Sequence, residues 1–282
     1  MYSNFRQVSN LSYIIGSLNT HHFTGIGKHD VSKIADIILK ERFDIVALQE
    51  VRRREAIELL ISRLPGWAGE HGEDKSSGLG FGFLWNTKRV RECSKDKTPE
   101  ILTSYHSSTQ LHRNPFYGRF TPNGLIGGAF FEIRLINVHI HHGGSDNIQN
   151  IEQRMAEFKT ISNDIYKYLS SHRYGNNMPA YTIVLGDYNL CSWQCLQEEF
   201  LNNENSAKTH QAEKTTLRRA EAGFSNDYDH FGYDENRFIG TNIFYERVDT
   251  VNKYMNNDFQ LHMEKVSDHV PIKLELVLNP RL

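Results

Sequence analysis

The sequence is short of cysteine, of long apolar runs and of any marked excess of one charge. Its 282 residues include only three cysteines, Cys93, Cys191 and Cys195, an odd number without a ladder of spacings. This argues against a secreted scaffold held together by disulfides. Although Cys191 and Cys195 are four residues apart, small buried thiols in a reducing compartment are favoured over a zinc site or a disulfide.

No apolar run approaches the about 20 residues that a membrane-spanning helix needs, so we expect no membrane span. The longest apolar runs, Ile45–Leu48 and Tyr181–Leu185, have the length of buried strands. The first residues lack a basic start, an apolar stretch and a cleavage site, so we expect no secretory signal and a cytoplasmic protein. A signal removed before this numbering begins would leave the same sequence, so secretion stays open.

The formal net charge is −2, so the chain as a whole has no electrostatic attraction for nucleic acid. Any phosphate must therefore be bound by a local site or through a bound cation. The length and the hydrophobic fraction of 39% are those of an ordinary globular protein. Because no repeat, linker or low-complexity tract divides the sequence, we expect one α/β domain over residues 1–282.

Short apolar runs alternate with segments of helical periodicity. We predict strands at Tyr13–Leu18, Asp44–Gln49, Phe81–Trp85, Phe130–Ile140, Tyr181–Leu185, near Phe231, at Thr241–Phe244 and at Ile272–Val277. We predict helices after an N-cap at Asp30, over Arg53–Leu64, over Ile151–Leu169 and near Trp193–Phe200. Residues 91–128 are polar and rich in turn formers, and we expect an irregular segment there.

Several predicted strands end abruptly in a carboxylate, an amide or an imidazole. These strand-end residues are Asn19, Glu50, His139, Asp187 with Asn189, and Asp268 with His269. A rigid sheet fixes the positions of such side chains while the adjoining loops give access to them. Oxygen ligands that converge in this way suit a hard cation such as Mg²⁺ or Mn²⁺.

Each motif taken alone has an ordinary structural explanation. Glu50 at the end of a buried strand would simply be solvated, and Asp187 and Asn189 would form an Asx-type turn after Gly186. An Asp-His pair such as Asp268-His269 is common in loops. The same pair can also bind metal and transfer a proton, because imidazole titrates near neutral pH.

Together, the motifs SLNT, LQEV, GDYNL and SDHVPI resemble the endonuclease/exonuclease/phosphatase superfamily, in order and over most of the chain. The segments FGFLWNTKRV, HRNP, LINVHIHHGG and SNDYDHFGYD are similar to its deoxyribonuclease-type branch. The cysteine-and-arginine signature of the inositol phosphatases is missing. The resemblance implies a two-layer β-sandwich flanked by helices, the deoxyribonuclease-like four-layer α/β/β/α arrangement.

The resemblance also implies residue roles. It assigns catalysis to His139, Asp187, Asn189, Asp229 and His269, metal binding to Asn19, Glu50 and Asp268, and a substrate phosphate to Arg113. His269 would activate water, and Asp229 would hold its imidazole in one tautomer. The chain departs from the branch at Leu79, where the branch places an acidic partner for the histidine at position 139. We expect the extra histidines His141 and His142 to face solvent or the far side of the strand.

These residues predict an Mg²⁺- or Mn²⁺-dependent phosphodiesterase. The leading hypothesis is a nuclease that acts on DNA, with RNA as a second candidate substrate. A phosphatase or lipid phosphodiesterase with the same site is the alternative. A binding module without activity is disfavoured because every motif carboxylate is present. Basic residues of segments 91–128 and 202–225 would track a nucleic-acid backbone if they border the cleft, or else form a mixed-charge surface: Lys95, Lys97, Arg113, Arg119, Lys208, Lys214, Arg218 and Arg219.

Overall fold

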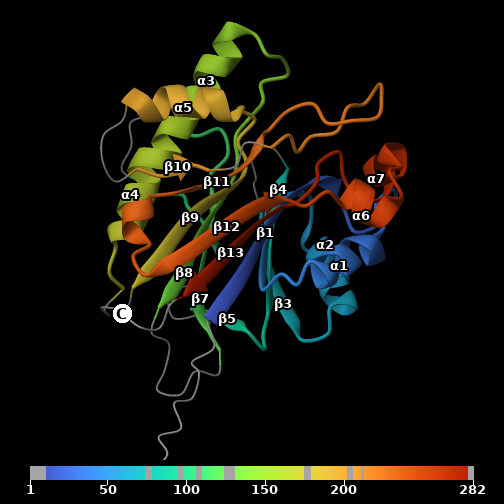
Figure 1. The fold of residues 1–282 in the computed structure, drawn as a ribbon, viewed down its shortest axis with the longest axis horizontal. Coiled ribbons are helices and arrows are strands. Elements are labelled where there is room, and N and C mark those ends of the chain that lie inside the picture. The colour runs from blue at the N-terminus through green and yellow to red at the C-terminus, as the bar shows by residue number, and fades with distance from the viewer. Residues whose placement is uncertain are drawn as a thin grey trace, which may run out of the picture.

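The computed structural model describes residues 11–73, 78–93, 98–105, 110–123, 131–174, 179–201, 206–210 and 213–278. Two mixed β-sheets pack face to face, and helices cover both outer faces (Figure 1). This is the α/β/β/α sandwich that the sequence motifs imply, so the predicted fold class is confirmed. No helix in these ranges is long and apolar enough to cross a membrane.

The first sheet has the strand order β12-β13-β1-β2-β4-β3. Its strands are β1 (Leu11–Phe23), β2 (Ile45–Val51), β3 (Trp67–Gly72), β4 (Gly80–Asn86), β12 (Thr241–Arg247) and β13 (Ile272–Leu278). β1 and β2 run parallel, with Asn19 in register with Gln49. Because the carboxyl ends of parallel strands meet at one edge, Asn19 and Glu50 come together there.

The second sheet has the order β10-β11-β9-β8-β7-β5, with β6 paired to β7. Its strands are β5 (Val90–Glu92), β6 (Glu100–Ile101), β7 (Phe116–Pro122), β8 (Glu132–His139), β9 (Ala180–Asp187), β10 (Lys208–Thr209) and β11 (Asp229–Tyr233). In the central strand β9, Asp187 is in register with His139 of parallel β8 and with Asp229 of antiparallel β11. Strand pairing alone thus brings three predicted site residues side by side.

The helices are α1 (Val31–Lys40), α2 (Arg54–Arg63), α3 (Ile148–Lys159), α4 (Tyr166–Ser171), α5 (Ser192–Leu201), α6 (Thr250–Met255) and α7 (Phe259–Lys265). Asp30 caps α1 as predicted, because its side chain accepts hydrogen bonds from the backbone N–H groups of Ser32 and Lys33. α1 and α2 pack on the first sheet, and α3 to α5 cover the second (Figure 1).

Three apolar layers hold these elements together. The layer between the sheets includes Phe83, Phe116 and Ile183, all at most 1% exposed. The outer layers join Ile34 of α1 to Leu48 of β2, and Phe158 of α3 to Val184 of β9. The central strands β2 and β9 therefore have apolar side chains on both faces, which explains their nearly continuous hydrophobic sequences.

The expectation of an irregular segment at residues 91–128 was wrong where β7 lies. All seven residues of β7 are buried, and one of them is Arg119. Arg119 reads as a surface residue in the sequence, but its guanidinium pairs with the buried carboxylate of Glu132 at 2.6 Å. Arg134 pairs with the same carboxylate at 2.9 Å, so Arg119 is a structural residue and cannot track a substrate in the cleft.

Other boundaries differ in smaller ways. β3, α6 and α7 were not predicted, since β3 is a polar edge strand and the two helices have only six and seven residues. The predicted helix Ile151–Leu169 is divided by a π-helical turn at Thr160–Ile165. Phe130, with which a strand was expected to begin, lies outside the described residues, as do Lys95 and Lys97.

Candidate active site

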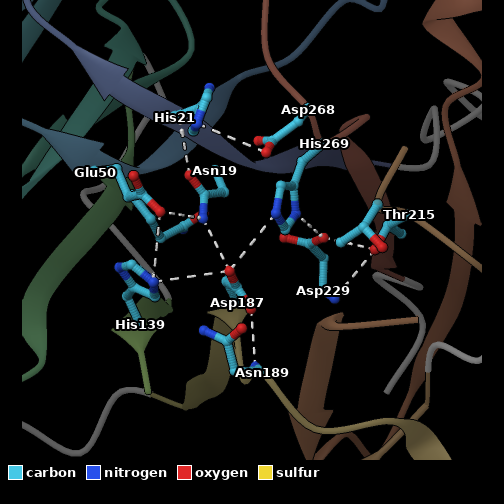
Figure 2. A network of polar contacts seen from close by, with 12 residues as sticks. Asn19, His21, Glu50, His139, Asp187, Asn189, Thr215, Asp229, Asp268 and His269 are labelled. Atoms are coloured by element: carbon cyan, nitrogen blue, oxygen red, sulfur yellow. Dashed lines mark hydrogen bonds and ion pairs between the residues drawn. The ribbon is translucent and has the colours of Figure 1, made fainter. Parts of the chain in front are cut away.

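The ends of the central strands of both sheets surround a pocket of about 390 Å³. Seven of the predicted site residues line it: Glu50, Arg113, His139, Asp187, Asn189, Asp268 and His269. The other two lie directly behind its wall, with Asn19 1% exposed and Asp229 fully buried. The structure therefore brings all nine together from segments that are far apart in the sequence, and Figure 2 labels all of them except Arg113.

Asn19 links the two sheets through its side-chain amide. Its Nδ2 donates to Oε1 of Glu50 at 3.0 Å in the first sheet and to Oδ2 of Asp187 at 2.8 Å in the second (Figure 2). Its backbone carbonyl accepts a hydrogen bond from the hydroxyl of Ser267 at 2.6 Å. Asn19 thus fixes two carboxylates relative to each other and ties both to the segment that carries His269.

The imidazole of His269 is oriented by a buried carboxylate. Nδ1 of His269 lies 2.7 Å from Oδ2 of Asp229, and its Nε2 lies 3.8 Å from Oδ2 of Asp187. The hydroxyl of Thr215 donates to the same Oδ2 of Asp229 at 2.6 Å (Figure 2). With Nδ1 held in this way, Nε2 is the nitrogen left for chemistry on the Asp187 side.

His269 and Asp187 compete for one proton. Burial works against a charged His269, but the carboxylates of Asp229 and Asp187 hold its pKa well above the ordinary value. Burial raises the pKa of Asp187 to about 7, although the charge of His269 opposes the increase. The raised pKa favours the protonated imidazole, so Nε2 of His269 has to release this proton before it can accept one from water.

His139 is held as a neutral imidazole. Burial and the nearby charge of Arg113 lower its pKa well below the ordinary value. Its Nδ1 is buried and has no hydrogen-bond partner within the described part of the chain, and the apolar Leu79 lines the same pocket. Its Nε2 faces Oε1 of Glu50 at 3.7 Å and Oδ2 of Asp187 at 3.8 Å. Because buried N–H groups are rarely left unpaired, the proton belongs on Nε2, which makes His139 a hydrogen-bond donor.

Asp268 occupies the opposite side of the network from His139 (Figure 2). Its Oδ2 lies 3.7 Å from Nε2 of His21 and 3.3 Å from a guanidinium nitrogen of Arg219. Burial acts to raise the pKa of Asp268, but the neighbouring charges of His269 and His21 outweigh it and lower the pKa. Asp268 is therefore an ionised carboxylate at the pocket wall.

Arg113 lies at the pocket wall near His139 and is only 8% exposed. Its guanidinium donates to the backbone carbonyl of His139 at 3.4 Å and lies 3.4 Å from Nδ1 of His141. Beneath it, the buried carboxyl group of Glu157 in α3 accepts hydrogen bonds from the backbone N–H groups of His112 and His141. Burial raises the pKa of Glu157 to about 7. Arg113 is thus held by its contacts with His139 and His141, and the backbone on both sides of the pocket wall, at His112 and His141, is anchored to Glu157.

Of the two positions expected for His141 and His142, the far side of the strand is wrong, because both half-exposed side chains line the pocket. The ring of His141 stacks on His112 with centroids 3.8 Å apart. His142 interacts with Asp146 at 3.3 Å. The loop after β8 turns back over the strand end at Gly143 and Gly144, both with positive φ, and this turn brings the two histidines over the pocket.

The backbone is strained at the rim of the pocket. Glu50, His21, His22 and Asn189 all have positive φ, between 46° and 61°, which is costly for residues other than glycine. Gly186 has φ 137°, and a Cβ placed there would come within 2.1 Å of the carbonyl oxygen of Val138. Strain of this kind persists only where the surroundings enforce it, and such positions are concentrated at functional sites.

The donor atoms suit a hard divalent cation, since Glu50, Asp187 and Asp268 present carboxylate oxygens to one pocket. Of the residues predicted to bind metal, Asn19 and Glu50 touch each other, whereas Asp268 contacts His21 and Arg219. Nowhere in the described ranges are three or more His, Cys, Asp or Glu side chains already spaced to hold a metal. Glu50 is also engaged by Nδ1 of His22 at 3.0 Å, so a cation would have to displace such contacts.

Sequence reasoning missed four residues that contribute to this network: Thr215, His21, His22 and Glu157. Thr215 lies in a polar stretch without a periodic pattern, and only its contact with Asp229 marks it. His21 and His22 directly follow the SLNT motif, and this proximity was an available signal. Glu157 looks like an ordinary polar helix residue in the sequence, and only its 3% exposure distinguishes it.

No protein-family model matches the sequence, and no curated protein matches it. Solved structures do share the fold. An endonuclease/exonuclease/phosphatase family protein from Bacteroides thetaiotaomicron matches with a TM-score of 0.65 and 18% identity, over 97% of both chains. A mannosyl-6-phosphatase from the same organism matches with a TM-score of 0.62 and 17% identity, over 94% of this chain and 100% of the other.

A third structure with this fold is TDP2 from D. rerio, solved with a single-stranded DNA product. It matches with a TM-score of 0.58 and 16% identity, over 94% of this chain and 98% of the other. At such identities the likeness establishes the fold and no more. The three proteins nevertheless show that one architecture carries both phosphatases and proteins that bind a DNA product, so the substrate must be argued from the site.

Proposed function

We propose that this protein is a metal-dependent phosphodiesterase of the endonuclease/exonuclease/phosphatase type that hydrolyses nucleic acid, with DNA as the favoured substrate. The observation that carries the proposal is the buried His269–Asp229 pair, 2.7 Å apart, next to a pocket that three further carboxylates and Arg113 share. In this arrangement the imidazole of His269 is the proton acceptor and the three carboxylates offer a site for a metal cation. The guanidinium of Arg113 supplies a positive charge that can bind phosphate.

In this mechanism a water molecule in the pocket attacks the phosphorus atom, and His269 accepts its proton at Nε2. The bond between phosphorus and the leaving oxygen breaks, and the departing oxygen takes up a proton from solvent. Asp229 stabilises the imidazolium that forms and keeps the ring from turning, with Thr215 fixing the carboxylate. His139 donates a hydrogen bond from Nε2 to a non-bridging phosphate oxygen, and Arg113 binds the same phosphate. Asp187 accepts hydrogen bonds from the side-chain amide of Asn19 and from the backbone N–H of Asn189, each at 2.8 Å. Held in this way, its carboxylate aligns the attacking water.

Glu50, with Asn19 and Asp268, would hold Mg²⁺ or Mn²⁺ in this site. The cation would neutralise the negative charge that builds up on the phosphate oxygens and on the leaving group. Its binding would replace the contacts that Glu50 and Asp268 make with His22 and Arg219. Once these contacts are released, the carboxylate oxygens of Glu50 and Asp268 are available to the cation.

The preference for DNA is supported by Arg113 in the pocket, by the sequence resemblance to the deoxyribonuclease-type branch and by the DNA product bound to TDP2, which has the same fold. The test is a panel of plasmid DNA, single-stranded DNA, RNA, an inositol phosphate and sphingomyelin, assayed with magnesium and then with chelator. We expect cleavage of DNA that chelator abolishes. Intact nucleic acids together with turnover of a small phosphate ester would replace the nuclease proposal with a phosphatase.

A further inference from the structure

The segment between β10 and β11 carries two adjacent arginines on a small hairpin that lies over the pocket. Within the hairpin, Leu217 bridges to Phe224, and the backbone N–H of Arg218 donates to the carbonyl of Gly223 at 2.9 Å. The hairpin is orange in Figure 1 and projects beyond the ends of the two sheets. It is an ordered part of the pocket border.

The hairpin is also fixed to the catalytic segment. Thr216 forms a β-bridge with His269, and the backbone N–H of Leu217 donates to the carbonyl of Asp268 at 2.7 Å. On the other side, the backbone N–H of Val270 donates to the carbonyl of Thr215 at 3.0 Å. The position of the hairpin relative to the reacting groups is therefore set by backbone pairing and does not depend on long side chains.

The two arginines differ in their surroundings. Arg218 forms an ion pair with Glu221 inside the hairpin, and its Nε donates to the carbonyl of Phe224 at 3.1 Å, away from the pocket. Arg219 lines the pocket, its side chain is 78% exposed, and its guanidinium lies 3.3 Å from the carboxylate of Asp268. A cation bound by Asp268 would compete with this contact and turn the guanidinium of Arg219 toward an incoming anion.

The two pocket arginines lie at different ends of the site. Arg113 contacts His139, whereas Arg219 contacts Asp268, and His139 and Asp268 lie on opposite sides of the network in Figure 2. A single phosphate next to His139 and Arg113 would leave Arg219 without a phosphate to bind. A substrate strand that carries phosphates at regular intervals supplies a second one.

We propose that Arg219 binds a second, non-reacting phosphate of the substrate and thereby selects a polynucleotide strand over a small phosphate ester. This inference rests on the proposed function and extends it. A guanidinium matches phosphate because its N–H groups can donate two parallel hydrogen bonds. The hairpin supplies the placement, because its pairing with the segment around His269 fixes the backbone that carries Arg219 relative to that histidine.

The test compares two substrates at saturating magnesium, a single-stranded DNA oligonucleotide and bis(p-nitrophenyl) phosphate, which has one phosphate only. The variants are Arg219→Gln and, as a matched control on the same hairpin, Arg218→Gln. For Arg219→Gln we expect the ratio of kcat/KM between oligonucleotide and small diester to fall about 3- to 10-fold at low salt. The slope of log KM for the oligonucleotide against log salt should fall by about 0.7, the value for one phosphate contact on a single strand.

Arg218→Gln should leave the substrate ratio and the salt slope as they are in the unmodified protein. Equal losses on both substrates in Arg219→Gln would mean that Arg219 serves the reacting phosphate, and no loss on either would mean that it binds none. Both results overturn the inference. An unmodified protein that hydrolyses only the small diester also overturns it but leaves the phosphodiesterase proposal standing. Inactivity on both substrates, in contrast, would reject the proposed function itself.

Discussion

The most searching prediction concerns His269 and Asp229, which we expect to act as one unit. The perturbations are His269→Ala, Asp229→Asn and the double variant. His269→Ala removes the proton acceptor. Asp229→Asn removes the negative charge that orients the imidazole, while the asparagine side chain keeps nearly the shape of the aspartate. Because the 2.7 Å contact between Nδ1 of His269 and Oδ2 of Asp229 is buried, water does not compete with it in the unmodified protein.

General-base catalysis contributes about 10²- to 10⁴-fold to rate, which sets the expected loss for His269→Ala. This corresponds to about 2.7 to 5.5 kcal/mol in activation free energy, at about 1.36 kcal/mol per factor of ten. Asp229→Asn should lose a similar or smaller factor, because the imidazole that accepts the proton is still present and only the carboxylate charge that orients and stabilises it is removed. Once the imidazole is gone, Asp229 has nothing left to orient, so the double variant should lose little more than His269→Ala.

The assay is single-turnover hydrolysis of a DNA oligonucleotide at saturating enzyme and magnesium, with thermal unfolding measured on each variant. Asp227→Asn is the matched control, because Asp227 is a partly buried carboxylate two residues away that accepts from the backbone N–H of Ser192 at 2.9 Å. The control should cost stability but not the rate of the folded enzyme. If the losses of the two single variants multiply in the double variant, Asp229 does not work through His269 and the mechanism is wrong.

Three further predictions test the cation, the acid sensitivity and the backbone. Glu50→Gln should raise the magnesium concentration needed for half-maximal turnover without changing the circular dichroism spectrum, and an unchanged magnesium dependence would reject Glu50 as a ligand. Burial lowers the pKa of His262 from its ordinary 6.5 to about 4, so the stability due to its neutral ring is present above pH 6.5 and is lost as the pH falls toward 4. His262→Gln should therefore flatten the pH dependence of urea unfolding over this window by up to about 1.4 kcal/mol per pH unit, and equal slopes would contradict the assignment. Gly186→Ala should destabilise the fold by more than about 3 kcal/mol in urea unfolding, because the added Cβ would meet the carbonyl of Val138, and a neutral result would show that β8 and β9 can separate there.

The sequence by itself predicted the architecture and nine residues that the structure brings together in and behind one pocket. Apolar runs such as Ile45–Leu48 predicted buried strands, because a strand that is covered on both faces is apolar at nearly every position instead of alternating with polar residues. Polar residues at the ends of these runs predicted the site, since the carboxyl ends of parallel strands meet at one edge of a sheet. Arg119 shows the limit of such reasoning, because the partner that makes its burial possible, Glu132, pairs with it across strands β7 and β8.

Only the tertiary structure decided how the site residues work. The pKa of Asp187 rises to about 7 because strands from two sheets bury it beside His269 and Asp229, and no local sequence encodes that burial. Likewise, Thr215 becomes part of the catalytic network because a hairpin pairs with the segment around His269, more than 50 residues further along the chain. Residue type and strand position are local properties that a sequence displays. Proton affinity, tautomer and the choice of partner depend on desolvation and on charges brought from distant segments, and these exist only once the two sheets have packed together.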